Sequence, residues 1–320
     1  MRKIIILSLA ILILFIVGCG GSRSKKDLEN ELAYRQLGIN KLEEGDYEEA
    51  VKAFQKALDQ SMAVIDELEI DICYYKAAAQ YKAGDVKGAI KTYTALIDYD
   101  KKNADARYLR GTLYLGQGDT KNALTDYEAV LKLEKNNGAR YNQIGEKLQN
   151  AGLEKETGTI LNQALELKGE KAVDYRNKGY SCYLLGQYDS ARTYLDKAIN
   201  MEDKEAVFYL AQVLDAKGDK EQADQLYESY IKDHSDDQNA LDALWRARVQ
   251  EGNYTQALKF LQIALEQKDV QNAQELRRNE IAILEQLLDL TQAKEKMKAY
   301  VEDYPEDEAA AREYEFLKSR

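Results

Sequence analysis

A short turn recurs along this sequence at nearly constant intervals, and it constrains the fold more than any other feature. Each turn holds a glycine, which Asp or Asn often follows. The glycines are Gly45, Gly84, Gly118, Gly152, Gly186, Gly218 and Gly252, separated by 39, 34, 34, 34, 32 and 34 residues. Glycine ends helices readily because it tolerates left-handed backbone angles, and Asp or Asn can cap the helix that follows. The spacing therefore predicts a series of helix–turn–helix units.

Side chains of similar size return at fixed places around each turn. Seven residues before the turn glycine stand Gly38, Ala77, Gly111, Gly145, Gly179, Ala211 and Trp245. Five residues after it stand Ala50, Ala89, Ala123, Thr157, Ala191, Ala223 and Ala257. Two antiparallel helices approach closely only where small side chains face each other. The pattern therefore predicts tightly packed helix pairs.

This pattern resembles the tetratricopeptide repeat, most clearly in residues 45–50 (GDYEEA) and 109–111 (LRG). A weaker eighth unit has Leu288 in place of the turn glycine, and Pro305 follows 17 residues later. The resemblance covers residues 27–305. It implies an all-α fold, a right-handed superhelical solenoid of about eight helix–turn–helix units. Residues 306–320 are expected to form a C-terminal capping helix, since a repeat stack needs its exposed end covered.

Composition agrees with helices throughout the chain. The sequence contains a single proline, Pro305, and no alternating run of Val, Ile and Thr, so we expect almost no sheet. Five additional residues precede the second unit. They lie within residues 62–68, where the apolar residues have helical spacing, and we expect them to lengthen a helix.

The N-terminus carries a sorting signal. Arg2 and Lys3 precede an apolar run at residues 4–17, followed by Gly18 and Cys19. Residues 16–19 (IVGC) resemble the lipobox of bacterial lipoproteins, which implies removal of residues 1–18 and a diacylglyceryl group on Cys19. The alternative is an uncleaved membrane anchor, but a spanning helix needs ~20 apolar residues. Residues 19–26 would then form a flexible tether between the lipid and the repeats.

The net charge of −11 bears on the possible partners. An acidic chain without a basic stripe is poorly suited to nucleic acid, so we predict no nucleic-acid partner. The charge favours solubility and basic partners.

The first helices of the repeats carry many aromatic side chains. In the family that the chain resembles, these helices line a concave face, and residues at i, i+4 and i+7 share one face of a helix. Tyr and Arg commonly anchor binding surfaces. The candidate groove residues are Tyr74, Tyr81, Tyr108, Arg176, Tyr180, Tyr183, Phe208 and Arg246. We predict that they bind a peptide or protein segment, with packing between repeats as the alternative role of the tyrosines.

No motif with a catalytic mechanism is present, and we predict neither an enzyme, nor a metal site, nor a cofactor. His234 is the only histidine, and it lies in a linker without a second ligand. Cys73 and Cys182 lie three units apart, too far for a disulfide, and are expected to be small buried hydrophobic residues.

These features together predict a non-catalytic interaction scaffold. It would be lipid-anchored at the extracytoplasmic face of a bacterial membrane, or in a periplasm, and would bind a protein or peptide partner. A role in cell-envelope assembly or secretion fits this arrangement. The alternative is a ligand-binding lipoprotein that captures a peptide or glycan for a transporter.

Overall fold

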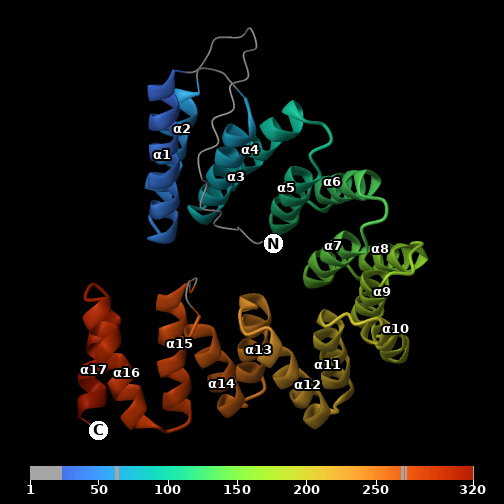
Figure 1. Ribbon diagram of the computed structural model, residues 1–320. Helices are drawn as coiled ribbons and strands as arrows, with labels where there is room; N and C mark the ends of the chain where they lie inside the picture. Colours follow the sequence, from blue (N-terminus) through green and yellow to red (C-terminus); the bar gives the residue numbers. More distant parts are fainter. Residues whose placement is uncertain (1–23, 62–64, 268–269, 271, 320) are drawn as a thin grey trace. The chain divides into compact units, whose positions relative to one another are not determined.

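A computed structural model describes residues 24–319 except 62–64, 268, 269 and 271 (Figure 1). This described part contains 17 α-helices and no strand. The helices are α1 (Lys25–Glu43), α2 (Tyr47–Gln60), α3 (Glu67–Lys82), α4 (Val86–Tyr99), α5 (Ala104–Gly116), α6 (Thr120–Leu133), α7 (Gly138–Asn150), α8 (Glu154–Glu166), α9 (Ala172–Leu184), α10 (Tyr188–Asn200), α11 (Glu205–Lys217), α12 (Lys220–Asp233), α13 (Gln238–Gln250), α14 (Tyr254–Leu265), α15 (Ala273–Gln286), α16 (Leu290–Asp303) and α17 (Glu308–Lys318). The all-α repeat fold predicted from the sequence is confirmed.

The chain forms two compact units, Met1–Thr157 and Gly158–Arg320. In each unit, helices that follow one another in the sequence pack side by side, as α1 does on α2 and α9 on α10. Seven such pairs are found in the described residues: α1–α2, α3–α4, α5–α6, α9–α10, α11–α12, α13–α14 and α15–α16. Each unit is therefore an α-helical repeat solenoid whose core runs between successive pairs.

The turn glycines adopt the conformation that the sequence predicts. All seven have φ between 71° and 90°, the left-handed region. Asp85, Asp119 and Asn253 then cap the next helix by accepting a hydrogen bond from a backbone N–H. Asp46 and Asp219 begin their helices without such a bond. The turns thus depend more on the glycine than on the cap.

Close packing within the pairs explains the small residues before each turn. A Cβ on Gly38 would lie 2.5 Å from Phe54 Cε1, and one on Gly179 would lie 2.6 Å from Leu195 Cγ. The alanines five residues after the turn, such as Ala123, are completely buried. A larger side chain at Gly38 or Gly179 would therefore push the two helices apart. The seventh repeat differs, because Trp245 occupies this place and is buried.

The last repeat departs from this pattern at its turn. Leu288 takes the left-handed position, with φ 59°, and is 81% exposed. The pair α15–α16 is still formed, and α17 packs on α16 through Ala310 and Leu317, which are buried. This is the capping helix expected for residues 306–320.

Two details differ from the sequence-based expectations. The extra residues before the second repeat lengthen α3 only in part: α3 has 16 residues, against 13 in α5, α7 and α9, but it begins at Glu67 after the N-cap Asp66, and α2 ends at Gln60. Residues 62–64 lie outside the described residues. Asp66 accepts a hydrogen bond from Leu68 N, which competes with helix continuation. Residues 25 and 26 of the predicted tether belong to α1. The signal segment 1–18 and Cys19 lie outside the described residues.

Candidate functional site

Two of the predicted groove residues in the first unit have packing roles. Tyr74 donates a hydrogen bond to Asn103 Oδ1 over 2.7 Å, and its ring lies 6.1 Å from that of Tyr93. The Tyr108 ring lies beneath the Arg140 guanidinium, 4.8 Å from its Cζ. Both tyrosines join neighbouring repeats, as the alternative role anticipated. Tyr81, in contrast, is 56% exposed.

The two predicted arginines of the second unit form ion pairs. Arg176 Nη1 lies 2.8 Å from Asp203 Oδ1 and 2.7 Å from Glu205 Oε2. Arg246 pairs with Glu275 over 2.9 Å, and its Cζ lies 4.3 Å from the centre of the Trp245 ring. Arg176 therefore links α9 to α11, and Arg246 links α13 to α15.

The remaining three predicted residues, Tyr180, Tyr183 and Phe208, come together in the second unit. They belong to an aromatic row formed by Tyr180, Tyr183, Phe208, Tyr209 and Tyr227 from α9, α11 and α12. The ring centres of Tyr180 and Tyr183 are 5.8 Å apart, and those of Tyr180 and Tyr209 are 4.5 Å apart. The ring centre of Phe208 lies 5.9 Å from that of Tyr209 and 5.6 Å from that of Tyr227. Three of the eight predicted residues thus lie within one set of ring contacts.

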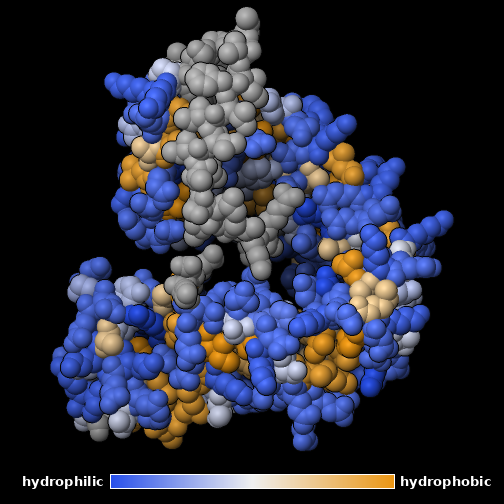
Figure 2. Space-filling view, viewed as in Figure 1, coloured by the Kyte–Doolittle hydropathy of each residue, from blue (hydrophilic) through white to orange (hydrophobic). Residues whose placement is uncertain are grey.

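The aromatic row borders an open hollow of about 260 Å³. Tyr183, Phe208, Tyr227 and Leu244 supply its apolar walls, and charged or polar side chains from α11, α12 and α13 supply the rest. The polar members are Gln212, Asp215, Lys220, Arg248 and Glu251. Figure 2 shows a mainly hydrophilic surface on which hydrophobic residues form separate patches, some of them over α11 to α14.

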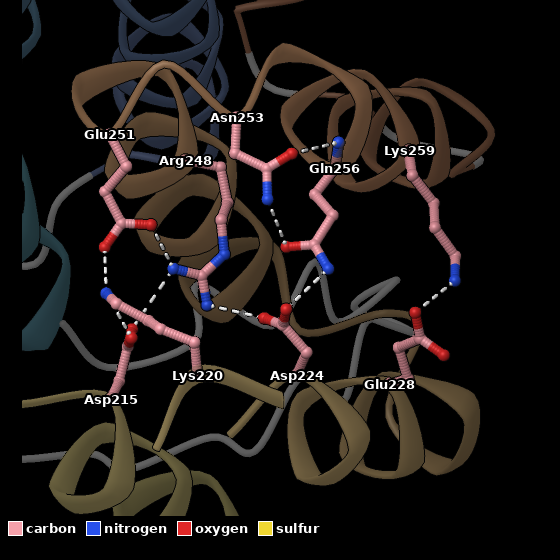
Figure 3. A network of polar contacts seen from close by, with 9 residues as sticks. All are labelled: Asp215, Lys220, Asp224, Glu228, Arg248, Glu251, Asn253, Gln256 and Lys259. Carbon is pink, nitrogen blue, oxygen red and sulfur yellow. Dashed lines mark hydrogen bonds and ion pairs between the residues drawn. The ribbon is translucent and has the colours of Figure 1, made fainter. Parts of the chain in front are cut away.

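Arg248 is the centre of the polar side of the hollow (Figure 3). It is 1% exposed, and its Nη1 donates to Asp215 Oδ2 at 3.2 Å and to Glu251 Oε2 at 2.6 Å. Its Nη2 donates to Asp224 Oδ1 at 2.8 Å. Arg248 thereby connects α11, α12 and α13, and Gln256 extends the network to α14 by donating to Asp224.

Lys220 is the second cation of this network. Its Nζ forms ion pairs with Glu251 and with Asp215. Nζ lies 2.6 Å from Asp215 Oδ1, but the angles at the two atoms do not suit a hydrogen bond. The network therefore contains three carboxylates, on Asp215, Asp224 and Glu251, and two cations. Its formal charge is −1.

The pKa values follow from this arrangement. Burial lowers the pKa of Arg248, but the adjacent carboxylates outweigh burial and raise it above its ordinary value. Burial raises the pKa of Glu251, and Lys220 and Arg248 more than reverse this, so that it lies below 4.5. The pKa of Tyr227 is raised, by burial first and by the charge of Asp215 next. Arg248, Lys220 and Glu251 are therefore charged at neutral pH.

Some buried polar atoms beside the hollow lack a hydrogen-bond partner. Among the described residues, Gln212 Oε1 and Arg248 Nε have none. Arg248 Cζ lies 5.5 Å from the centre of the Tyr227 ring, so the guanidinium also has an aromatic contact. Gln212 Oε1 is left as an acceptor without a donor, which is a costly state for a buried group.

The sequence-based prediction missed Arg248, Gln212, Asp215 and Lys220. Arg248 stands four residues before the turn glycine, where Leu148, Cys182, Leu214 and Leu284 are apolar but Lys41, Gln80 and Tyr114 are polar. The position is therefore not uniformly apolar, and the sequence gives only a weak signal that Arg248 has buried partners. The partners themselves lie 24 and 33 residues away, so that no local pattern marks them.

The other candidate sites have ordinary structural roles. His234 stacks on Tyr230, with ring centres 4.4 Å apart. Cys182 is buried and Cys73 half-buried, and both are free thiols. Within the described ranges, no group of three His, Cys, Asp or Glu side chains is placed to hold a metal ion. None of the helices described here combines the length and hydrophobicity needed to cross a bilayer.

Comparison with known proteins identifies the repeats. Tetratricopeptide-repeat families match residues 33–61, 74–139 and 177–240. No catalytic family is among the matches, and no curated protein matches the sequence.

Several solved structures are similar to the chain. A tetratricopeptide repeat protein from Parabacteroides merdae is 15% identical, with TM-score 0.48, over 80% of this chain and 99% of its own. Pseudomonas aeruginosa PilF is 17% identical, with TM-score 0.40, over 65% of this chain and 93% of its own. A tetratricopeptide protein of Thermus thermophilus is 20% identical, with TM-score 0.37, over 57% and 99%. These TM-scores are below 0.5, and the likeness says nothing about what this chain binds.

Repeats of this family typically bind protein partners. The chain contains tetratricopeptide repeats at residues 33–61, 74–139 and 177–240, within an all-α helical repeat fold.

Proposed function

We propose that this chain is a non-catalytic scaffold that binds an extended segment of a partner protein against the first helices of its second unit. The observation that carries the proposal is the aromatic row beside an open hollow with an unpartnered buried acceptor, Gln212 Oε1. Aromatic side chains that are half-buried in the free protein offer contact area at a low entropy cost. A row of them along α9 and α11 suits an extended chain.

The size of the hollow favours a protein segment over a free ligand. Sites for small molecules enclose ~300–1,000 Å³, whereas this hollow holds about 260 Å³ and is open. It accommodates one side chain of a longer partner, with the rest of the segment along the aromatic row. The alternative of a lipoprotein that delivers a ligand to a transporter is therefore less well supported.

The proposal includes a lipid anchor on Cys19 and an extracytoplasmic location at a bacterial membrane. Its support is the sequence: two basic residues, an apolar run of 14 residues and the lipobox-like residues 16–19. Two acyl chains hold a protein firmly to a membrane, while one chain does so only marginally. An anchored scaffold would hold its partner close to the bilayer, as cell-envelope assembly or secretion requires.

The binding surface can be tested by crosslinking in intact cells. A photoreactive amino acid at Ala216, which is exposed at the hollow, should yield a discrete crosslinked product with the partner. The matched control is the same amino acid at Gln225, exposed on α12 and outside the hollow. A product of equal yield from both positions, or none from Ala216, would refute the proposed surface.

The anchor has an independent test. Cells given a labelled fatty acid should incorporate it into the wild-type chain and not into Cys19→Ala. Labelling of the variant at the wild-type level would disprove lipidation at this residue.

A further inference from the structure

The polar side of the hollow has a net negative charge and one unpartnered acceptor; the unpartnered donor beside it, Arg248 Nε, belongs to a guanidinium that contacts the Tyr227 ring. Gln212 Oε1 is buried without a partner among the described residues, and Asp215 Oδ1 has an ion pair with Lys220 but no aligned hydrogen bond. The surrounding network has a formal charge of −1, from three carboxylates and two cations. A group that enters the hollow therefore meets a negative potential and one acceptor, Gln212 Oε1, that lacks a donor.

The acceptors on Gln212 and Asp215 share a helix face with an aromatic wall. Phe208, Gln212 and Asp215 stand at i, i+4 and i+7 on α11 and therefore form one stripe. All three line the hollow, opposite Ala243 and Ala247 of α13. An entering side chain would therefore contact both an apolar surface and the acceptors.

We propose that the hollow receives a basic side chain of the partner segment, either the ammonium of lysine or the guanidinium of arginine. The methylene groups lie against Phe208 and Tyr183, and the terminal N–H groups donate to Gln212 and Asp215. If the Gln212 amide turns its Oε1 toward an N–H of the entering side chain, that oxygen gains the hydrogen bond it lacks, and the free-energy cost of its burial is removed. This inference rests on the proposed function, because the side chain belongs to the segment bound along the aromatic row.

An anionic side chain suits the hollow less well. Arg248 and Lys220 each already contact at least two carboxylates, so neither has an uncompensated positive charge. An added carboxylate would be the fourth in the network, and like charges at close range repel. The negative charge of the whole chain, −11, also favours a basic partner.

The experiment uses the full chain with 13C-labelled alanine methyl groups. Ala216, Ala243 and Ala247 line the hollow and report on its occupation by their chemical shifts. The probes are the N-acetyl, N-methylamide derivatives of lysine, arginine, norleucine and glutamic acid. Norleucine replaces the ammonium of lysine by a hydrogen and so keeps the apolar stem.

We expect the lysine or arginine probe to shift these three methyl signals. The norleucine probe should bind about tenfold more weakly or worse, as expected for loss of a charged hydrogen bond. The lysine and arginine titrations differ in affinity and so identify the preferred head group. Gln212→Leu should weaken binding about tenfold, Gln212→Glu should strengthen it, and the matched Gln225→Leu should leave it unchanged.

Several outcomes would overturn the inference. Equal affinity for norleucine, tighter binding of the glutamic acid probe, no shift with any probe, or no effect of Gln212→Leu would each do so. The alanine spectrum of every variant shows directly whether it is folded. If the basic probes fail while the crosslink at Ala216 remains, the inference is wrong and the proposed function stands. Loss of that crosslink would reject the proposed function itself.

Discussion

Replacing Arg248 by methionine tests the central feature of the second unit. Methionine has a similar length but no charge, so Asp215 and Glu251 would keep only Lys220 as a cation. Asp224 would lose its ion pair and keep the hydrogen bond from Gln256. Arg248 is 1% exposed, and water from the open hollow would replace its three ion pairs only in part. We therefore expect a large loss of stability.

The size of this loss follows from burial. Removing one partner of a buried ion pair costs ~3–5 kcal/mol, because the other charge stays buried. The three carboxylate side chains are 16%, 23% and 35% exposed, and partial hydration places the cost near the lower end, about 3 kcal/mol. For a body of this size each kcal/mol lowers Tm by ~2–4 °C, so the melting temperature of the second unit should fall by about 6–12 °C.

Arg246→Met is the matched control. Arg246 lies on the same helix, and its ion pair with Glu275 is exposed, with side chains 47% and 54% accessible. Exposed pairs contribute only ~0–1 kcal/mol. Calorimetry and urea denaturation followed by circular dichroism would compare the two variants. Equal losses of stability in both would refute the argument from burial.

The loss should also depend on pH. The pKa of Glu251 lies below its ordinary value of 4.5 in the folded chain. Its ion pairs therefore stabilise the fold above about pH 4.5, and this contribution disappears as the pH falls through the folded-state pKa. The difference between the wild type and Arg248→Met should be full at pH 7 and smaller at pH 3. A difference that grows toward acid pH would contradict this assignment.

Three further predictions concern single positions in the fold. Gly38→Ala should destabilise the first unit by ~1–3 kcal/mol in urea denaturation, because the added Cβ would lie 2.5 Å from Phe54 Cε1. Gly116→Ala should stabilise the same unit by ~0.5–1 kcal/mol, because an added Cβ there meets no neighbouring group within 4 Å. The opposite order would disprove the packing argument. Leu288→Gly should stabilise the second unit by ~1 kcal/mol in the same assay, because Leu288 is 81% exposed and adopts a left-handed angle, φ 59°, that glycine tolerates better. A decrease in stability would show that this leucine has a packing role. Burial raises the pKa of the Cys182 thiol to about 11, so maleimide at pH 7 should modify Cys182 much more slowly than half-buried Cys73. Mass spectrometry after a short pulse of maleimide measures the two rates, and equal rates would show that Cys182 is accessible.

The repeat and its turns could be predicted because they depend on local sequence. A glycine such as Gly118 adopts its left-handed angle in response to the helices on either side, and Asp119 caps the helix that immediately follows. The small residue at Gly111 faces Tyr127, which lies in the same helix pair. These interactions occur within about one repeat, so their periodicity is visible in the sequence.

The connection before α3 shows where local reasoning was insufficient. The apolar spacing of residues 62–68 is compatible with a helix, but Asp66 uses its side chain to start a new helix. An N-cap and a helix interior differ by one hydrogen bond, and periodicity of apolar residues does not reveal which is formed.

The sequence by itself determined the fold class, the pairing of helices and the final capping helix, since each depends on neighbours close along the chain. Only the tertiary structure decided which aromatic residues pack and which border a hollow: Tyr108 lies under Arg140, whereas Tyr183 and Phe208 form a wall. It also brought Arg248 to carboxylates 24 and 33 residues away, on two other helices. A buried charge is stable only where such partners converge, and convergence is a property of the stacked repeats rather than of any single one.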